Sequence, residues 1–143
     1  AVMDPDPRYW DEEFAKTTRY GEIITPPIMV SYMATRIGPG KGDPITQAFI
    51  DDPESDGIGR VAKTGALPAV PTPLVRVLNA GNELEIRSYP SLGDKIFFQN
   101  RYADIRERVG REGQSFLIVT TETTYKNQNG EILCINRSSS IRR

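Results

Sequence analysis

The sequence contains no histidine, and this absence limits the chemistry that the chain can perform. Histidine is the side chain whose unperturbed pKa lies between about 5 and 8, so imidazole acid–base catalysis by this chain alone is excluded. The single cysteine, Cys134, excludes an internal disulfide and favours a reducing compartment. No apolar run approaches the roughly 20 residues that cross a bilayer, and no signal peptide is visible. We therefore expect a cytoplasmic protein that contacts no membrane.

A large net charge is also missing. The 18 basic residues nearly balance the 19 acidic ones, which leaves a net charge of −1. This balance does not favour nucleic acid as a partner. The length of 143 residues suits one domain, and 38% hydrophobic residues are enough for an ordinary core. We expect Cys134, which lies in a predicted strand, to be a small core residue.

The N-terminal part of the sequence predicts two helices. Asp6 is a good N-cap for the first helix, and Trp10 and Phe14 share a face through which this helix would pack. The second helix is predicted over residues 28–37, and it is apolar on all sides. A helix of this kind is buried all round, so the rest of the domain must wrap around it.

Residues 38–73 differ in composition from the rest of the chain. They contain six glycines and six prolines, with a short helix predicted over 45–50. A connection this long is uncommon in a compact domain and is usually functional or mobile. A solvated excursion and a segment that lines a substrate site are equally compatible with this pattern.

The C-terminal half predicts an antiparallel sheet. Asn129-Gly130 is a strong hairpin signal, and Gly110 to Gly113 supports another hairpin before it. The predicted strands cover residues 74–78, 83–89, 95–106, 115–125 and 131–142. Long antiparallel strands after a buried helix indicate an α+β domain. One long antiparallel sheet wrapped around one central helix is the hot-dog fold, which we predict as a single domain over residues 1–143.

Several segments resemble one known family. Asp4–Asp11 reads Asp-Pro-Asp-Pro-Arg-Tyr-Trp-Asp and is followed by Phe14-Ala15. It resembles the signature Asp-x-Asn-Pro-x-His-x-Asp of MaoC-like (R)-specific enoyl-CoA hydratases. Gly21–Pro27 resembles the segment that leads into the central helix of that family, and Asn79–Glu83 is in the same style. The Pro-Pro pair is similar to that of the FAS1-like dehydratase domain, the non-catalytic N-terminal half of double-hot-dog MaoC dehydratases.

The resemblance implies a definite chemistry for the active members of the family. In them an Asp and a His, five residues apart, activate a water that adds to the double bond of a trans-2-enoyl thioester. Such an addition needs a base for the water, a proton for the α-carbon and donors for the enolate oxygen. In this sequence Asp4 falls on the Asp position and Tyr9 on the His position. Tyrosine, with an unperturbed pKa of about 10, is a poor base at neutral pH, so we expect no catalytic residue in this chain.

Both degenerate positions also have plainer interpretations, which we favour. We expect Asp4 to be a solvated residue near a frayed terminus. We expect Tyr9 to be a half-buried aromatic residue on the first helix. The resemblance places the acyl chain beside the start of the central helix. The substrate-binding candidates are therefore Pro26, Pro27, Ile28, Met29 and Tyr32.

Three arginines are candidates for the phosphates of coenzyme A. Charges such as theirs usually form a solvated surface, but a guanidinium group binds phosphate well. These residues are Arg106, Arg111 and Arg137. We expect no metal and no cofactor, since the coenzyme A thioester is the substrate.

Three functions remain open at this point. In the first, the chain is a hot-dog subunit of a heteromeric enoyl-CoA hydratase/dehydratase. It binds a long fatty acyl or steroid side chain, and a second MaoC-like hot-dog chain or domain with Asp-x-Asn-Pro-x-His supplies the catalytic dyad. In the second, the chain is a non-catalytic acyl-CoA-binding or regulatory module. In the third, it is a hydratase that works alone through Asp4 and Tyr9.

Overall fold

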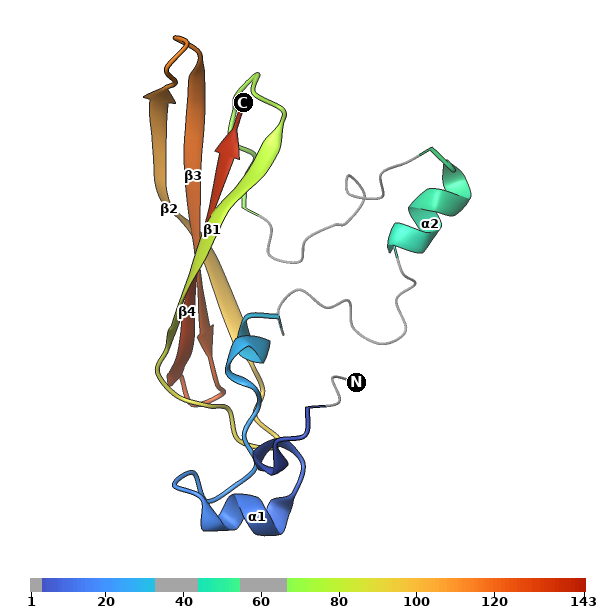
Figure 1. Cartoon of the computed structure of the whole chain (residues 1–143), viewed down its shortest axis with the longest axis vertical. Coiled ribbons are helices and arrows are strands. Elements are labelled where there is room, and N and C mark those ends of the chain that lie inside the picture. The colour runs from blue at the N-terminus through green and yellow to red at the C-terminus, as the bar shows by residue number, and fades with distance from the viewer. Residues whose placement is uncertain (1–3, 33–43, 55–66) are drawn as a thin grey trace.

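A four-stranded antiparallel sheet dominates the computed structural model, in which residues 4–32, 44–54 and 67–143 are described (Figure 1). The strands are β1 (Val77–Ile86), β2 (Phe97–Val109), β3 (Ser115–Lys126) and β4 (Ile132–Arg142). Their order in the sheet is β1-β4-β3-β2, so β1 and β2 are the edge strands. The helical elements in the described residues are η1 (Pro7–Tyr9), α1 (Glu12–Thr17), η2 (Pro27–Tyr32) and α2 (Pro44–Asp51).

Two tight turns connect the last three strands, and both predicted hairpins are confirmed. Between β2 and β3 the Gly110 nitrogen donates to the Gln114 carbonyl at 2.8 Å. Between β3 and β4 the Asn127 nitrogen donates to the Glu131 carbonyl at 3.1 Å. Gly130 has a φ of +80°, which glycine adopts without the steric cost that a side chain brings. The Asn-Gly pair therefore fits this turn because the turn requires a positive φ at Gly130.

The first strand corrects the sequence prediction. Residues 74–78 and 83–89 were expected to form two strands, whereas β1 runs without a break from Val77 to Ile86. Its pairing with β4 shifts between Asn79 and Gly81, where Gly81 has a φ of +121° and its nitrogen donates to the Asn79 side chain. A β-bulge of this kind uses the residue types that also favour a turn. The sequence pattern indicated a turn between two strands, whereas the structure has one continuous strand with a bulge.

The first helix is shorter than predicted and packs differently. Asp6 caps the single turn η1, while α1 begins after Asp11, whose side chain accepts a hydrogen bond from the Phe14 nitrogen at 3.0 Å. The predicted packing through Trp10 and Phe14 is wrong for this chain, because both are exposed, Trp10 to 62%. No described element covers them, since η1 and α1 lie beyond the end of the sheet (Figure 1).

The central helix is seen only in its first part. Pro27–Tyr32 form the 3-10 helix η2, and residues 33–37 of the predicted helix lie outside the described residues. Val30 is fully buried, and the Tyr125 hydroxyl donates to the Ser31 carbonyl at 2.8 Å. Ile28, in contrast, is 57% exposed, so the expected burial on all sides is wrong for this residue. Val30 belongs to the core cluster with residues of the sheet, and Ile28 does not.

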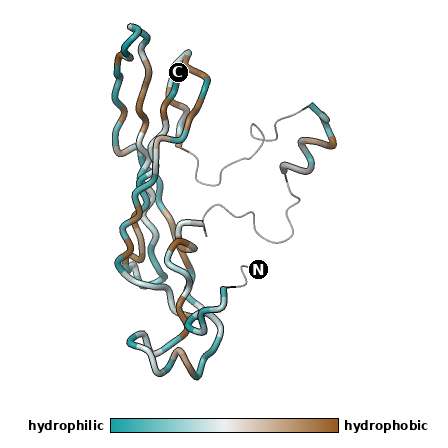
Figure 2. Tube along the Cα trace, in the orientation of Figure 1, coloured by the Kyte–Doolittle hydropathy of each residue, from teal (hydrophilic) through white to brown (hydrophobic). Residues whose placement is uncertain are grey.

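The core lies between η2 and one side of the sheet, which we call the inner face. Its buried members are Val30, Tyr125, Leu133 and Cys134, with Leu84, Ile86, Ile96 and Phe98 packed around them. The prediction that Cys134 is a core residue is confirmed, and burial raises the pKa of its thiol. Hydrophobic and hydrophilic residues follow each other along the strands, as expected when successive side chains point to opposite faces (Figure 2).

The Gly/Pro-rich excursion is described only in part. The short helix expected over 45–50 is confirmed as α2. Residues 38–43 and 55–66 of the excursion lie outside the described residues. Near its end, the Tyr102 hydroxyl on β2 donates to the Pro68 carbonyl at 2.5 Å.

Candidate functional site

The two positions that carry the catalytic dyad in the resembling family lie at the foot of the sheet. Asp4 is exposed, and its Oδ1 atom accepts a hydrogen bond from the Asp6 nitrogen at 3.0 Å. Tyr9 ends η1 and is half-buried, with the Arg8 guanidinium 5.8 Å from its ring centroid. These environments suit a solvated carboxylate and an aromatic packing residue. That Asp4 and Tyr9 have no catalytic role stays a prediction.

Asp6 organises this segment. Its carboxylate accepts hydrogen bonds from the Arg8 nitrogen at 3.0 Å and from the Arg8 guanidinium. Hydrogen bonds from Arg8 hold the pKa of the Asp6 carboxyl below its usual range. The Arg8 carbonyl accepts a hydrogen bond from the Ile24 nitrogen at 3.3 Å, which ties the segment to the chain that leads into η2.

Next to Tyr9 lies a cluster of two tyrosines and an arginine. The Tyr20 and Tyr89 rings meet edge to face, with centroids 5.3 Å apart and planes at 83°. The Arg19 guanidinium lies 4.8 Å from the Tyr20 centroid and donates to the Tyr20 hydroxyl at 2.6 Å. This bond lowers the pKa of Tyr20. Burial raises the pKa of Tyr89, and the neighbouring Tyr20 and Tyr9 hydroxyls add to that rise.

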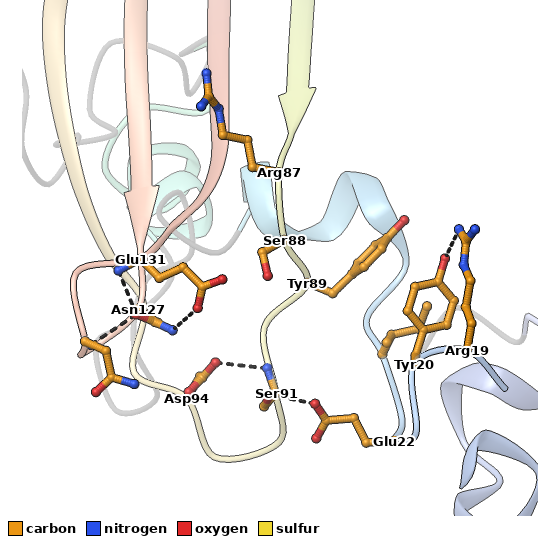
Figure 3. Close-up of a pocket in the computed structure, with 12 residues that line it drawn as sticks. Arg19, Tyr20, Glu22, Arg87, Ser88, Tyr89, Ser91, Asp94, Asn127 and Glu131 are labelled. Carbon is orange, nitrogen blue, oxygen red and sulfur yellow. Dashed lines mark hydrogen bonds between the residues drawn. The ribbon is translucent and has the colours of Figure 1, made fainter. Parts of the chain in front are cut away.

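This cluster forms one wall of a cavity of about 550 Å³ (Figure 3). The lining comes from three segments: residues 19–24 before η2, residues 87–94 after β1, and residues 127–131 in the β3–β4 turn. Such a volume is in the range of small-molecule sites, which run from about 300 to 1,000 Å³. Its lining is more polar than is usual for such sites.

The charged groups of the cavity are engaged with one another or with neighbours. The Ser91 hydroxyl donates to Glu22 at 2.7 Å, and the Ser91 nitrogen donates to Asp94 at 2.9 Å. The Asn127 amide donates to Glu131 at 3.1 Å. Two arginines against three carboxylates leave this lining with a net negative charge, so it is a poor site for phosphate groups.

The predicted substrate-binding residues lie outside this cavity. Pro26 precedes η2, and its carbonyl accepts a hydrogen bond from the Met29 nitrogen at 2.9 Å. Pro27 begins η2, and Tyr32 is its last residue. A role of Pro26, Pro27, Ile28, Met29 and Tyr32 in binding stays a prediction.

The three arginines predicted to bind phosphate are not brought together. Arg106 lies on β2 and pairs with Asp104, and Arg111 is exposed in the β2–β3 turn. Arg137 lies on β4, where its guanidinium contacts the carboxylates of Glu83, Glu85 and Glu122. Their role in binding coenzyme A also stays a prediction.

Sequence reasoning missed the Arg19, Tyr20 and Tyr89 cluster. The adjacent Arg-Tyr pair at positions 19–20 does not single out the cluster, because the sequence has the same pair at 8–9 and 101–102. Among the described residues, no group of three or more histidine, cysteine or acidic residues is arranged to hold a metal ion.

A sheet of this topology, packed on a short central helix behind a hydratase-like N-terminal segment, defines a hot-dog domain of the hydratase and dehydratase class. The family model of the FAS1-like dehydratase domain region matches residues 1–136, and the chain belongs to this family. A comparison with curated protein sequences finds no match.

Solved structures agree on the hot-dog fold. The MaoC-like dehydratase from Rhodospirillum rubrum superposes with a TM-score of 0.60 at 19% identity, over 99% of this chain and 78% of that one. A chain of the ChsH1-ChsH2 complex from Mycobacterium tuberculosis gives 0.65 at 16% identity, over 97% and 70%. A chain of the truncated HadBC (3R-hydroxyacyl-ACP dehydratase) complex from Mycobacterium tuberculosis gives 0.58 at 16% identity, over 94% and 74%. In the described part of the present chain, no helix is long and apolar enough to cross a membrane.

Proposed function

We propose that the chain is the non-catalytic hot-dog subunit of a heteromeric enoyl-CoA hydratase/dehydratase. One observation carries the proposal: the sequence of this domain of the dehydratase family has no histidine. The resemblance to the hydratase signature puts Tyr9 at the position of the catalytic histidine. A second hot-dog chain with the Asp–His pair would then activate the water. The present chain would bind the substrate, in the cytoplasm.

Two of the similar structures support a heteromeric arrangement. The ChsH1-ChsH2 complex and the HadBC complex each combine two hot-dog components. In the present chain, several large apolar side chains are exposed at the edges and foot of the sheet, among them Trp10, Val77 and Phe97. Their burial by a second subunit would be favourable, at about 25 cal/mol per Å² of apolar surface.

The proposed substrate is a trans-2-enoyl-CoA with a bulky acyl group, such as a long fatty acyl or steroid side chain. The acyl chain would run beside Pro26–Tyr32, where exposed Ile28 offers apolar contact. The coenzyme A part is substrate, and the proposal needs no cofactor. None of the residues Pro26–Tyr32 lines the polar cavity beside Tyr20, and the proposal does not require that cavity.

The test is reconstitution. The chain is mixed with a MaoC-like chain that carries Asp-x-Asn-Pro-x-His, and hydration of crotonyl-CoA and of bulkier enoyl-CoA thioesters is followed by the loss of enoyl absorbance. We expect activity on bulky substrates only in the mixture. Hydration by the pure chain that is lost in Asp4→Asn would contradict the proposal and favour a hydratase that works through Asp4 and Tyr9. Tight acyl-CoA binding without turnover in any mixture would indicate a binding module.

A further inference from the structure

Three Arg-Tyr pairs occur in the sequence, at positions 8–9, 19–20 and 101–102, and the structure gives each pair a different geometry. In the pair at 19–20, the Arg19 guanidinium donates to the hydroxyl of Tyr20 itself at 2.6 Å. The same guanidinium lies 4.8 Å from the Tyr20 ring centroid. The cation therefore contacts both the ring and the oxygen of one phenol (Figure 3).

In the other two pairs the guanidinium is bonded to a carboxylate instead. Arg8 donates to Asp6 at 2.9 Å, and its guanidinium lies 5.8 Å from the Tyr9 ring centroid. Arg101 donates to Glu122 at 2.7 Å. Because neighbouring residues of a strand point to opposite faces, Arg101 faces away from the tyrosine that follows it. Of these three pairs, the one at 19–20 is thus distinguished by a cation on the hydroxyl oxygen.

A cation bonded to a phenol oxygen favours the phenolate form. An opposite charge nearby and a hydrogen bond to the charged form both lower the pKa of an acid. The hydrogen bond from Arg19 lowers the pKa of Tyr20, against the opposing effect of burial. Tyr89, which meets Tyr20 edge to face, is affected in the opposite sense, because burial raises its pKa. Of the two stacked tyrosines, Tyr20 is therefore the one that loses its proton first.

The Tyr20 hydroxyl is also accessible to a small molecule. The Tyr20 side chain lines the cavity of about 550 Å³, a volume within the range of about 300 to 1,000 Å³ of small-molecule sites. The hydrogen bond between Arg19 and the Tyr20 hydroxyl is exposed. The ring is half-buried, and its edge-to-face contact with Tyr89, with centroids 5.3 Å apart, favours one orientation. A reagent with one aromatic ring can therefore enter the cavity and meet an oriented oxygen.

We propose that Tyr20 is a nucleophilic tyrosine and a site of covalent modification by small aryl electrophiles of the sulfonyl fluoride class. The phenolate oxygen attacks the sulfur, an O–S bond forms, the S–F bond breaks and fluoride leaves. The product is a sulfonate ester, and the phenol proton goes to the solvent. Arg19 is the positioning residue, since its guanidinium makes the phenolate available without reacting itself. This inference does not depend on the proposed function.

Two opposing effects set the size of the rate difference. A lower pKa raises the fraction of phenolate at neutral pH, but it also makes each phenolate a weaker nucleophile. For thiolates the logarithm of the intrinsic rate falls by about 0.4 to 0.5 for each unit of pKa. With a similar slope for a phenolate, a tenfold gain in its fraction leaves a net gain of about threefold. We therefore expect Tyr20 to react about three- to tenfold faster than Tyr9 and Tyr102 near neutral pH.

The experiment treats the full chain with toluenesulfonyl fluoride, a neutral reagent, and follows the label on Tyr9, Tyr20 and Tyr102 by peptide mass spectrometry. The three tyrosines share the preceding arginine, so each sample contains its own matched controls. Arg19→Met should lower the rate of Tyr20 to that of the other two, and Arg19→Lys should keep part of the gain. Arg111→Met removes an exposed arginine from the β2–β3 turn and should change none of the three rates. Arg19 is exposed, so folding should be intact, and circular dichroism checks this.

Two further measurements separate the folded geometry from the local sequence. As the pH rises, the labelling rate of Tyr20 should reach half its maximum below about 10, the usual pKa of tyrosine, and Arg19→Met should raise that midpoint. In urea the three tyrosines should react alike, because the bond at 19–20 is lost on unfolding. Equal rates in the folded chain, or a Tyr20 rate that Arg19→Met leaves unchanged, would overturn the inference. A preference for Tyr20 that persists in urea would also overturn it, since the fold would then not be its cause.

Discussion

Replacement of Tyr125 by phenylalanine tests how η2 is held on the sheet. The Tyr125 ring is almost fully buried beside Phe98, and its hydroxyl donates to the Ser31 carbonyl at 2.8 Å. Phenylalanine keeps the ring and its packing, so only the hydrogen bond is lost. A net intramolecular hydrogen bond contributes about 1 kcal/mol, and more when the remaining group stays dry. We expect Tyr125→Phe to lower the free energy of unfolding by about 1 to 2 kcal/mol.

The chain contains a matched control. Tyr102 also donates its hydroxyl to a backbone carbonyl, that of Pro68, but this bond is exposed to solvent. Water can replace an exposed bond, so Tyr102→Phe should cost no more than about 0.5 kcal/mol. Urea unfolding of both variants, followed by circular dichroism, measures the difference. Equal losses in the two variants would refute the idea that burial of the Tyr125 bond anchors η2.

Tyr125→Phe should also change how the free energy of unfolding depends on pH in the alkaline range. Burial raises the pKa of Tyr125 above that of an unfolded tyrosine, which is about 10. The folded state therefore holds the proton more tightly, and the stability from this group is lost as the pH rises above about 10. The fall in unfolding free energy above this pH should be shallower in Tyr125→Phe than in the wild type. If the slopes are equal, Tyr125 does not titrate as the structure implies.

Three further predictions follow from the sheet and its turns. Arg101 and Arg137 lower the pKa of Glu122, so the stability from this carboxylate should be present above about pH 4.5 and lost as the pH falls below it. In urea unfolding, Glu122→Gln should remove this fall in the free energy of unfolding at acid pH. Cys134 is fully buried, so a thiol reagent should label it only after unfolding, and Cys134→Ser should cost about 1 to 3 kcal/mol by burying a hydroxyl without an assigned partner. Gly130 has a φ of +80°, so Gly130→Ala should lower the unfolding free energy by about 1 to 2 kcal/mol in the same assay.

The sheet was predictable where local chemistry decides the structure. Asn129-Gly130 supplies the positive φ of a tight turn, and the long alternating segments around it form β3 and β4 as expected. The same local logic failed at Asn79–Gly81, because a bulge and a turn use the same residue types. Which of the two forms depends on the pairing of β1 with β4, and no short segment of sequence contains that information.

The candidate site was less predictable than the fold. The family signature located Asp4 and Tyr9, and it showed at once that the catalytic histidine is missing. The cavity wall, in contrast, combines Arg19 and Tyr20 with Tyr89, which is distant from them in the sequence. Tyr89 follows the end of β1, so its contact with Tyr20 depends on the tertiary fold.

The strand order has a consequence for how the domain is made. β2, β3 and β4 are joined by tight turns and pair with their sequence neighbours, so they can form by closing short loops. β1 pairs only with β4, which is synthesised after β2 and β3, and this contact must close a much longer loop of chain. During synthesis β1 therefore stays unpaired until β4, its neighbour in the sheet, has been made. On this reasoning β1 would be the last of the four strands to join the sheet.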